Sequence, residues 1–159
     1  MSEIVLREAR GDDFAWIVER HGAIYADEYN WDETFEALCA RIVDDFIANP
    51  DPRQRAWIAE LDGARAGCLI SVAKDEFSAQ LRLLLVEPLA RGQGVGTALV
   101  EECIRFARDQ GFTDLLLWTN HVLVDARRIY ERAGFELIDE EPHHSFGFDL
   151  IGQTWRLPL

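Results

Sequence analysis

A short apolar strand that runs into a glycine-rich helix start, residues 83–97, limits the fold of this chain more than any other feature. Gly92, Gly94 and Gly96 stand where the helix should begin. Glycine adopts backbone conformations that other residues avoid, and it lets a ligand approach the main chain closely. The first N–H groups of a helix and its dipole attract anions. The segment therefore predicts a cradle for a pyrophosphate group, with the cation Arg91 beside it.

Two common phosphate-binding motifs do not fit this segment. A P-loop ends in Gly-Lys-Ser/Thr, but the chain reads Val95-Gly96-Thr97 and has no lysine there. A dinucleotide fingerprint lies directly after its strand, whereas six residues separate Val86 from Gln93. Thr97 also stands where the third glycine of that fingerprint belongs. Both alternatives are therefore weakened.

The segment instead resembles the acyl-CoA signature of the GCN5-related N-acetyltransferase (GNAT) family, Q/R-x-x-G-x-G/A, which Arg91, Gly94 and Gly96 satisfy. A second run, residues 126–135, is similar to the family signature A-x-x-x-Y-E-x-x-G-F. The tyrosine of that signature protonates the departing CoA thiolate, and it corresponds to Tyr130. The chain resembles the family from end to end, which implies acetyl-CoA as its co-substrate.

The resemblance also implies which residues hold acetyl-CoA. The end of the strand supplies pantetheine contacts, the cradle supplies pyrophosphate contacts, and later residues complete the site. An asparagine that often holds the CoA arm is replaced by leucine at position 123, so Asn120 is the nearest substitute. The predicted cofactor-binding residues are Leu84, Leu85, Val86, Arg91, Gly92, Gln93, Gly94, Val95, Gly96, Thr97, Asn120, Arg127 and Tyr130, with Arg128 as an alternative to Arg127.

The general base is less well defined. In the histone-acetylating branch of the family a glutamate on the fourth strand deprotonates the amine, and Gln80 stands at that position. A glutamine cannot accept the proton. The alternatives are Glu28, Glu76, a chain of water molecules, or an amine that arrives already neutral. Among the carboxylates we favour Glu28, because residues 25–31 lie between the first two predicted helices, where this family shapes its acceptor pocket.

Hydrophobic periodicity predicts an α/β protein. The order of elements matches the GNAT fold: a mixed, largely antiparallel sheet of about seven strands with about four helices, splayed after the fourth strand, just beyond Val86. Asp12 and Asp125 are the predicted helix N-caps, and Asp62-Gly63 a hairpin turn. The predicted strands are 3–8, 56–61, 67–73, 79–86, 114–119, 135–140 and 152–157, and the predicted helices begin near 12, 33, 94 and 125.

Cysteine and histidine usage argues against metal binding. Cys39, Cys68 and Cys103 lack C-x-x-C spacing and fall in apolar segments, which favours buried free thiols in a reducing, cytoplasmic compartment. His143 and His144 form no metal pair, and we expect them to be exposed in a loop, with a position in the acceptor pocket as the alternative. The aromatic residues Trp16, Tyr25, Tyr29, Trp31 and Trp155 are predicted to be mostly core, with one or two in the acceptor pocket.

A formal net charge of -13 repels nucleic acid and anionic membranes, and the sequence contains no apolar stretch of membrane-spanning length. We expect residues 1–159 to form a single N-acetyltransferase domain. The resemblance is also compatible with a homodimer, because dimers are common in the family. The predicted partners are acetyl-CoA and an amine on a small molecule or protein. The competing hypothesis is a non-catalytic acyl-CoA-binding sensor or interaction module. Residues 143–155 further resemble the acetyltransferase half of fusions with winged-helix regulators.

Overall fold

The computed structural model describes residues 3–159, which form one seven-stranded sheet with helices on both faces. Along the chain the elements are β1 (Ile4–Glu8), α1 (Asp13–Tyr29), α2 (Glu33–Ala48), β2 (Arg55–Leu61), β3 (Ala64–Ala73), β4 (Ser78–Val86), the 3-10 turn η1 (Pro88–Ala90), α3 (Val95–Asp109), β5 (Asp114–Asn120), α4 (Val124–Ala133), β6 (Glu136–Ser145) and β7 (Phe148–Pro158).

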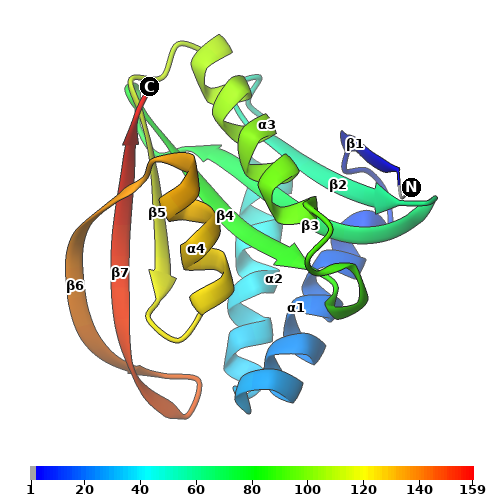
Figure 1. Cartoon of the computed structure of the whole chain (residues 1–159), viewed down its shortest axis with the longest axis vertical. Coiled ribbons are helices and arrows are strands. Elements are labelled where there is room, and N and C mark those ends of the chain that lie inside the picture. Colours follow the sequence, from blue (N-terminus) through cyan, green and yellow to red (C-terminus); the bar gives the residue numbers. More distant parts are fainter. Residues whose placement is uncertain (1–2) are drawn as a thin grey trace.

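The sheet has the strand order β1-β2-β3-β4-β5-β7-β6. Its only parallel pair within residues 3–159 is β4 with β5, and every other neighbouring pair is antiparallel. Helices α3 and α4 cover the near face of the sheet, and α1 and α2 cover the far face (Figure 1). The predicted α/β architecture is confirmed.

Strands β4 and β5 separate inside β4 and not at its end. They pair only from Ser78 opposite Asp114 to Leu81 opposite Leu117, although β4 continues to Val86. The prediction that they separate beyond Val86 was therefore wrong. The main chain of β4 after Leu81 has no strand partner on this side, so its N–H and C=O groups are available to a ligand.

A bulge in β4 follows the point of separation. The register with β3 shifts between Cys68 and Ile70, which leaves Leu83 and Leu84 opposite a single residue. Leu83 has a φ of 54°, an unusual value for a residue with a side chain. Bulges reorient the backbone and are frequent next to active sites. The Cys68 thiol donates a hydrogen bond to the Leu83 carbonyl (3.3 Å), which helps to hold this conformation.

Two apolar clusters hold the layers together. On the α3 and α4 side the buried residues include Leu99 of α3 and Leu117 of β5. On the α1 side they include Ile17 of α1 and Ile58 of β2. Each of these side chains is at most 1% exposed, so each face of the sheet has its own core. None of the helices within residues 3–159 is long and apolar enough to cross a membrane.

Two local predictions differ from the structure. Strands β6 and β7 form a long hairpin around Phe146 and Gly147, both at positive φ, where a long connection was predicted. The sequence of β6 is not recognisable as a full-length strand, because most of its residues are polar and exposed. Only one face of an edge strand needs to be apolar. Asp12 occupies the predicted N-cap position of α1, but its carboxylate bonds to Arg65 and makes no capping hydrogen bond. The prediction for Asp125 was wrong, because Asp125 lies inside the first turn of α4.

The carboxylate of Asp13, at the start of α1, is the centre of a buried ionic network. Asp13 is 1% exposed. The Arg7 guanidinium donates to both of its oxygens (2.6 and 3.0 Å), Arg65 Nε donates to Oδ1 (3.0 Å), and the Arg10 N–H donates to Oδ2 (2.9 Å). These bonds, those from Arg7 above all, lower the pKa of Asp13 to about 2. The network joins β1, α1 and β3.

Asp13→Asn should lower the free energy of unfolding at pH 7 by ~2 kcal/mol, because the folded-state pKa lies below the ordinary value. This contribution is present above the unfolded-state pKa and is lost as pH falls through the folded-state pKa of about 2. Urea denaturation of both proteins between pH 7 and pH 2 measures it. Asp12→Asn is the matched control, because Asp12 is 88% exposed and pairs with Arg65 alone. If the difference in free energy of unfolding between wild type and Asp13→Asn stayed constant down to pH 2, the ion pairs of Asp13 would not be its source.

Candidate functional site

The glycine-rich segment folds as a loop that delivers the N-terminus of α3 to the open side of β4. Gly92 and Gly94 have φ values of 77° and 87°, which residues with side chains rarely adopt. Gly96 serves a different purpose, because it lies in the first turn of α3. A Cβ atom there would stand 2.6 Å from Ile129 Cδ1, so glycine allows α3 and α4 to approach closely.

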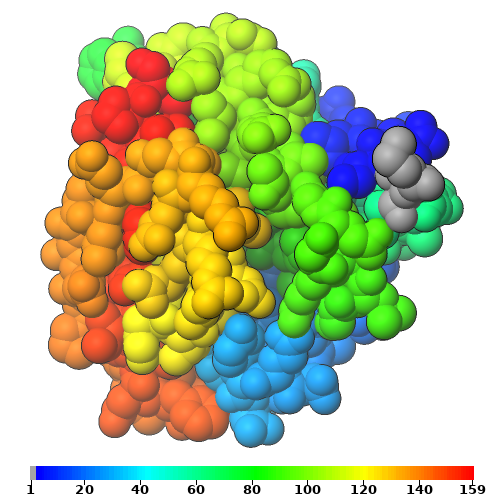
Figure 2. All heavy atoms as spheres, viewed as in Figure 1, coloured from blue at the N-terminus to red at the C-terminus, as the bar shows by residue number. Residues whose placement is uncertain are grey.

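The first cavity, of about 420 Å³, lies between this loop, the free side of β4 and α4. In Figure 2 the surface is hollowed between the yellow atoms of α4 and the green atoms of the loop that precedes α3. Its volume is typical of a site for a ligand of cofactor size. The lining consists of Tyr25, Glu28, Tyr29, Leu84, Leu85, Val86, Ala90, Arg91, Gly92, Gly94, Val95, Gly96, Thr97, Leu123, Asp125, Ala126, Arg128, Ile129 and Arg132.

The structure brings most of the predicted cofactor-binding residues to the first cavity, but four of them lie elsewhere. Gln93 is exposed, and its side-chain amide donates to the Leu89 carbonyl (3.2 Å). The Arg127 guanidinium donates to the His121 carbonyl (3.0 Å), and Arg128, its alternative, lines the cavity. Asn120 and Tyr130 line the second cavity described below.

Three arginines supply positive charge to the first cavity. Arg128 and Arg132 project from α4, and Arg91 precedes α3. Glu28 of α1 pairs with Arg91 through both of its oxygens (2.6 and 2.9 Å). This ion pair fixes the Arg91 guanidinium at the mouth of the cradle. It also means that both oxygens of the Glu28 carboxylate are already bonded.

A second cavity, of about 130 Å³, lies beside the separated part of β4, between β5, α4 and the two N-terminal helices. Aromatic side chains form much of its wall, and they contact one another: the Tyr25 ring stacks on Phe35 (4.6 Å between centroids), and Phe146 lies 4.8 Å from Trp31. The lining consists of His21, Tyr25, Trp31, Phe35, Leu38, Ile42, Gln80, Leu81, Arg82, Leu83, Leu84, Trp118, Thr119, Asn120, Leu123, Ala126, Tyr130 and Phe146.

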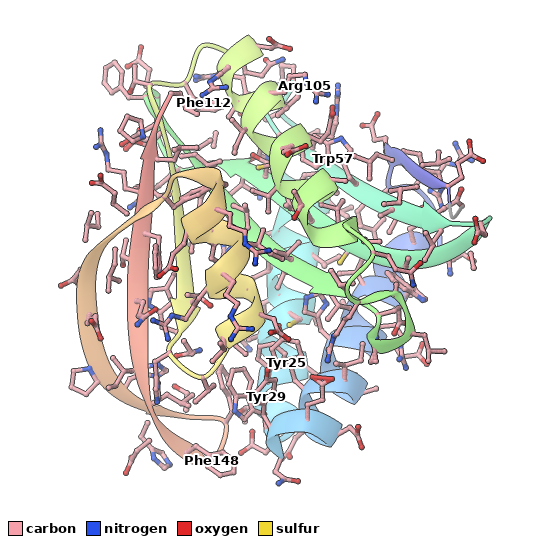
Figure 3. All side chains as sticks on the ribbon, in the orientation of Figure 1. Tyr25, Tyr29, Trp57, Arg105, Phe112 and Phe148 are labelled. Carbon is pink, nitrogen blue, oxygen red and sulfur yellow. The ribbon has the colours of Figure 1, made fainter. Side chains whose placement is uncertain are left out.

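The two cavities meet where β4 and β5 separate. Tyr25, Leu84, Leu123 and Ala126 line both of them. Tyr25 and its neighbour Tyr29 lie beside the lower end of α4 (Figure 3), with ring centroids 5.6 Å apart. A ligand in one cavity can therefore contact a ligand in the other through the opened sheet.

Two phenols lie at or beside this junction: Tyr25 of α1 lines both cavities, and Tyr130 of α4 lines the second. Burial raises the pKa of both hydroxyl groups well above the ordinary value of 10. Neither hydroxyl takes part in a hydrogen bond with another residue of the described chain. Both phenols are therefore protonated at physiological pH and can donate to a ligand. The sequence placed Tyr25 in the segment that shapes the acceptor pocket, but it did not indicate that this residue lines both cavities.

No carboxylate within residues 3–159 lines the second cavity. Gln80 lies there, Glu28 lies in the first cavity, and Glu76 is exposed in the connection from β3 to β4 and lines neither cavity. His21 Nδ1 donates to the Ile17 carbonyl (2.7 Å), and burial lowers the pKa of His21 to about 4. This ring is neutral at physiological pH, and it is a weak base.

The histidine pair near the C-terminus lies in strand β6, so the prediction of a loop was wrong. His143 is half-buried: its Nε2 bonds to Asn120 Oδ1 (2.7 Å), and its ring lies 5.2 Å from Trp118. His144 is exposed beside Asp149. His143 thus orients the side chain of Asn120 at the edge of the second cavity.

Thiol chemistry and metal binding find no support in the described residues. All three cysteines are free and buried, as predicted. Burial raises the pKa of Cys39 and of Cys103 to about 12, and a protonated thiol is a poor nucleophile. Within residues 3–159 no three histidine, cysteine or acidic side chains are grouped in a way that would hold a metal ion.

Comparison with known proteins gives the same picture as the geometry. The sequence model described as "Acetyltransferase (GNAT) family" matches residues 8–135. An uncharacterised N-acetyltransferase of Schizosaccharomyces pombe is 30% identical over 143 residues, which cover 84% of this chain and 80% of that protein. N-acetyltransferase family 8 member 2 of Rattus norvegicus is 36% identical over 85 residues, covering 50% of this chain and 38% of that protein. The chain thus spans about two fifths of that relative's length.

Solved structures share the fold. The protein YncA of Salmonella typhimurium, solved with its cofactor acetyl-CoA, superposes with a TM-score of 0.80 at 19% identity, covering 98% of this chain and 94% of that chain. At this identity the likeness establishes the fold alone. The family match extends over most of the chain and includes both the cradle and the segment with Tyr130, so this protein belongs to the GNAT acetyltransferase family.

Proposed function

We propose that the protein is an acetyl-CoA-dependent N-acetyltransferase that moves an acetyl group directly to a primary amine of a small molecule or protein. One observation carries the proposal: two cavities lie along the free edge of β4 and meet at the gap between β4 and β5. Direct transfer requires two ligands that approach from separate sides and touch at one point.

The first cavity fits acetyl-CoA. Its cradle combines two glycines at positive φ, the N-terminus of α3 and the cations Arg91, Arg128 and Arg132, which suit a pyrophosphate. The unpaired edge of β4 offers N–H and C=O groups to the amide-bearing pantetheine arm. Acetyl-CoA bound there would supply an acetyl group activated as a thioester.

The remaining steps fall to this chain's own residues. The amine enters the second cavity, whose aromatic walls exclude water. A bond forms between the amine nitrogen and the acetyl carbon, and the carbon–sulfur bond breaks. The reoriented main chain at Leu83 and Leu84 is placed to polarise the carbonyl oxygen. The phenol of Tyr130 donates its proton to the departing sulfur, and the proton that the amine nitrogen releases as the amide forms returns to the phenolate.

The alternative, a non-catalytic acyl-CoA-binding module, is favoured by one observation: the second cavity has Gln80 where a basic carboxylate was expected. Both hypotheses predict CoA binding. An assay of CoA release with acetyl-CoA and a panel of primary amines separates them. Release that depends on an amine supports the enzyme, whereas CoA binding without release for every amine supports the module.

In this assay we expect kcat/KM to rise with pH toward the pKa of the free amine, without an earlier plateau. The reason is that no carboxylate lines the second cavity, so the amine loses its proton to water before or during binding. Profiles for wild type and Glu28→Gln test this. Glu28→Gln should keep the same shape, because Glu28 pairs with Arg91 in the other cavity. If Glu28→Gln lost several orders of magnitude together with the low-pH limb, Glu28 would be a dedicated base.

Three further assignments also remain proposals. The similarity of residues 143–155 to regulator-linked acetyltransferases is proposed to reflect kinship with that branch of the family. Dimerisation is proposed from its frequency in the family. A cytoplasmic location is proposed from the three free thiols.

A further inference from the structure

Arg82 of β4 is a cation without a partner inside the second cavity. Its side chain is half-buried on the face of the sheet that α2 covers. Its guanidinium takes part in no ion pair or hydrogen bond with residues 3–159. Asp45 of α2 acts on it only at long range, and burial lowers the pKa of Arg82 more than Asp45 raises it.

Several other arginines of this fold bond to carboxylates, whereas the half-buried Arg55 and Arg127 have other partners, the Phe106 ring and the His121 carbonyl. Arg7 and Arg65 bond to the buried Asp13, Arg20 bonds to Glu87 (2.6 Å), and Arg156 bonds to Asp114 (2.8 Å). A half-buried guanidinium that lacks a carboxylate is unfavourable, because burial removes water that the protein does not replace. The position of Arg82 therefore suits a ligand that supplies the missing negative charge.

The surroundings of Arg82 describe the rest of that ligand. No carboxylate within the described chain lines the second cavity and competes for the guanidinium. Phe35, Trp118 and Phe146 provide apolar walls. The junction with the first cavity, where the amine must lie for transfer, opens from the same cavity beside Leu84 and Leu123, which line both cavities. An acceptor seated here contacts a cation, apolar walls and the transfer point together.

We infer that the acceptor is an amine that also carries a carboxylate and an apolar body, and that Arg82 binds the carboxylate. This inference rests on the proposed function, because it assigns the second cavity to the acceptor. Arg82 is then a determinant of specificity. The guanidinium matches a carboxylate with two parallel hydrogen bonds, which a neutral group cannot reproduce.

The test compares acids with neutral analogues of the same shape. The probes are L-phenylalanine with L-phenylalaninamide, and 4-(aminomethyl)benzoate with 4-(aminomethyl)benzamide, so that two separations of amine and carboxylate are covered. Calorimetry measures the Kd of each probe for the CoA-saturated protein. In at least one pair we expect the acid to bind about 10-fold or more tightly than the amide. This preference should disappear in Arg82→Gln and survive in part in Arg82→Lys.

Arg41→Gln is the matched control, because Arg41 is an exposed arginine of α2 outside the second cavity. It should keep the preference of the wild type. The inference is overturned if neither acid is preferred, or if the preference persists in Arg82→Gln. Should Arg82→Gln fail to fold, an undiminished preference in Arg82→Lys overturns it, and a reduced one supports it. Failure of the proposed function looks different: the acid would bind through Arg82, but no amine would release CoA from acetyl-CoA.

Discussion

Replacing Tyr130 with phenylalanine should lower kcat by about 100-fold or more and leave the Kd for CoA nearly unchanged. The hydroxyl is needed only when negative charge develops on sulfur, so its loss acts on the transition state. Burial raises the pKa of Tyr130, which keeps the proton on the phenol across the working pH range. The phenylalanine ring preserves the packing against Phe135, whose centroid lies 5.8 Å away, so the fold should be retained.

Steady-state rates and calorimetric CoA affinity of Tyr130→Phe provide the measurement. Tyr25→Phe is the necessary comparison, because Tyr25 lines both cavities and its hydroxyl is also protonated. We expect the larger loss of kcat in Tyr130→Phe. A wild-type kcat in Tyr130→Phe together with a large loss in Tyr25→Phe would transfer the role of the acid to Tyr25.

The sequence predicted the features that depend on local chemistry. The cradle was identifiable because Gly92 and Gly94 each adopt a positive φ, a backbone conformation that favours glycine whatever the rest of the fold. The amphipathic pattern of α3 and the Asp62-Gly63 turn of the β2–β3 hairpin are local in the same sense. Such features follow from a few neighbouring residues, and the structure confirms them.

The features that depend on distant segments were not predictable in the same way. The second cavity combines α1, α2, β4, β5 and the β6–β7 turn, and no pattern along the chain brings Phe146 next to Trp31. The engagement of Glu28 by Arg91 is a contact across 63 positions of sequence. Arg82 did give a signal, since it interrupts an apolar strand, but an alternating polar residue is equally compatible with a solvent-exposed face. Only the position of α2 reveals that this face is covered.

The point where β4 and β5 separate shows the same limit. Leu81 to Val86 reads as one uninterrupted strand, and nothing in it indicates where its partner leaves. The bulge at Leu83 and Leu84 requires a positive φ at a leucine, a conformation that local preference opposes. Tertiary packing imposes it, and the result is main chain directed at the site.

Gly94→Val should weaken CoA binding by about 100-fold or more. Valine is poorly suited to the φ of 87° at this position, so the loop must change conformation and the N–H groups at the start of α3 lose their alignment. Each charge-assisted hydrogen bond to the pyrophosphate contributes about 1.5–3 kcal/mol, and the loss of one or two accounts for the expected factor.

Gly63→Val separates this effect from general backbone strain. Gly63 lies in the β2–β3 turn with a φ of 85°, and a Cβ atom there would meet no other atom within 4 Å. The two substitutions therefore impose similar strain, one at the cradle and one in a turn that lines neither cavity. Calorimetry with CoA should show a loss in Gly94→Val and wild-type affinity in Gly63→Val. A folded Gly94→Val protein that bound CoA as tightly as Gly63→Val would contradict the prediction. Distorting the loop would then have left the contacts to CoA intact, so the pyrophosphate would not bind at the start of α3.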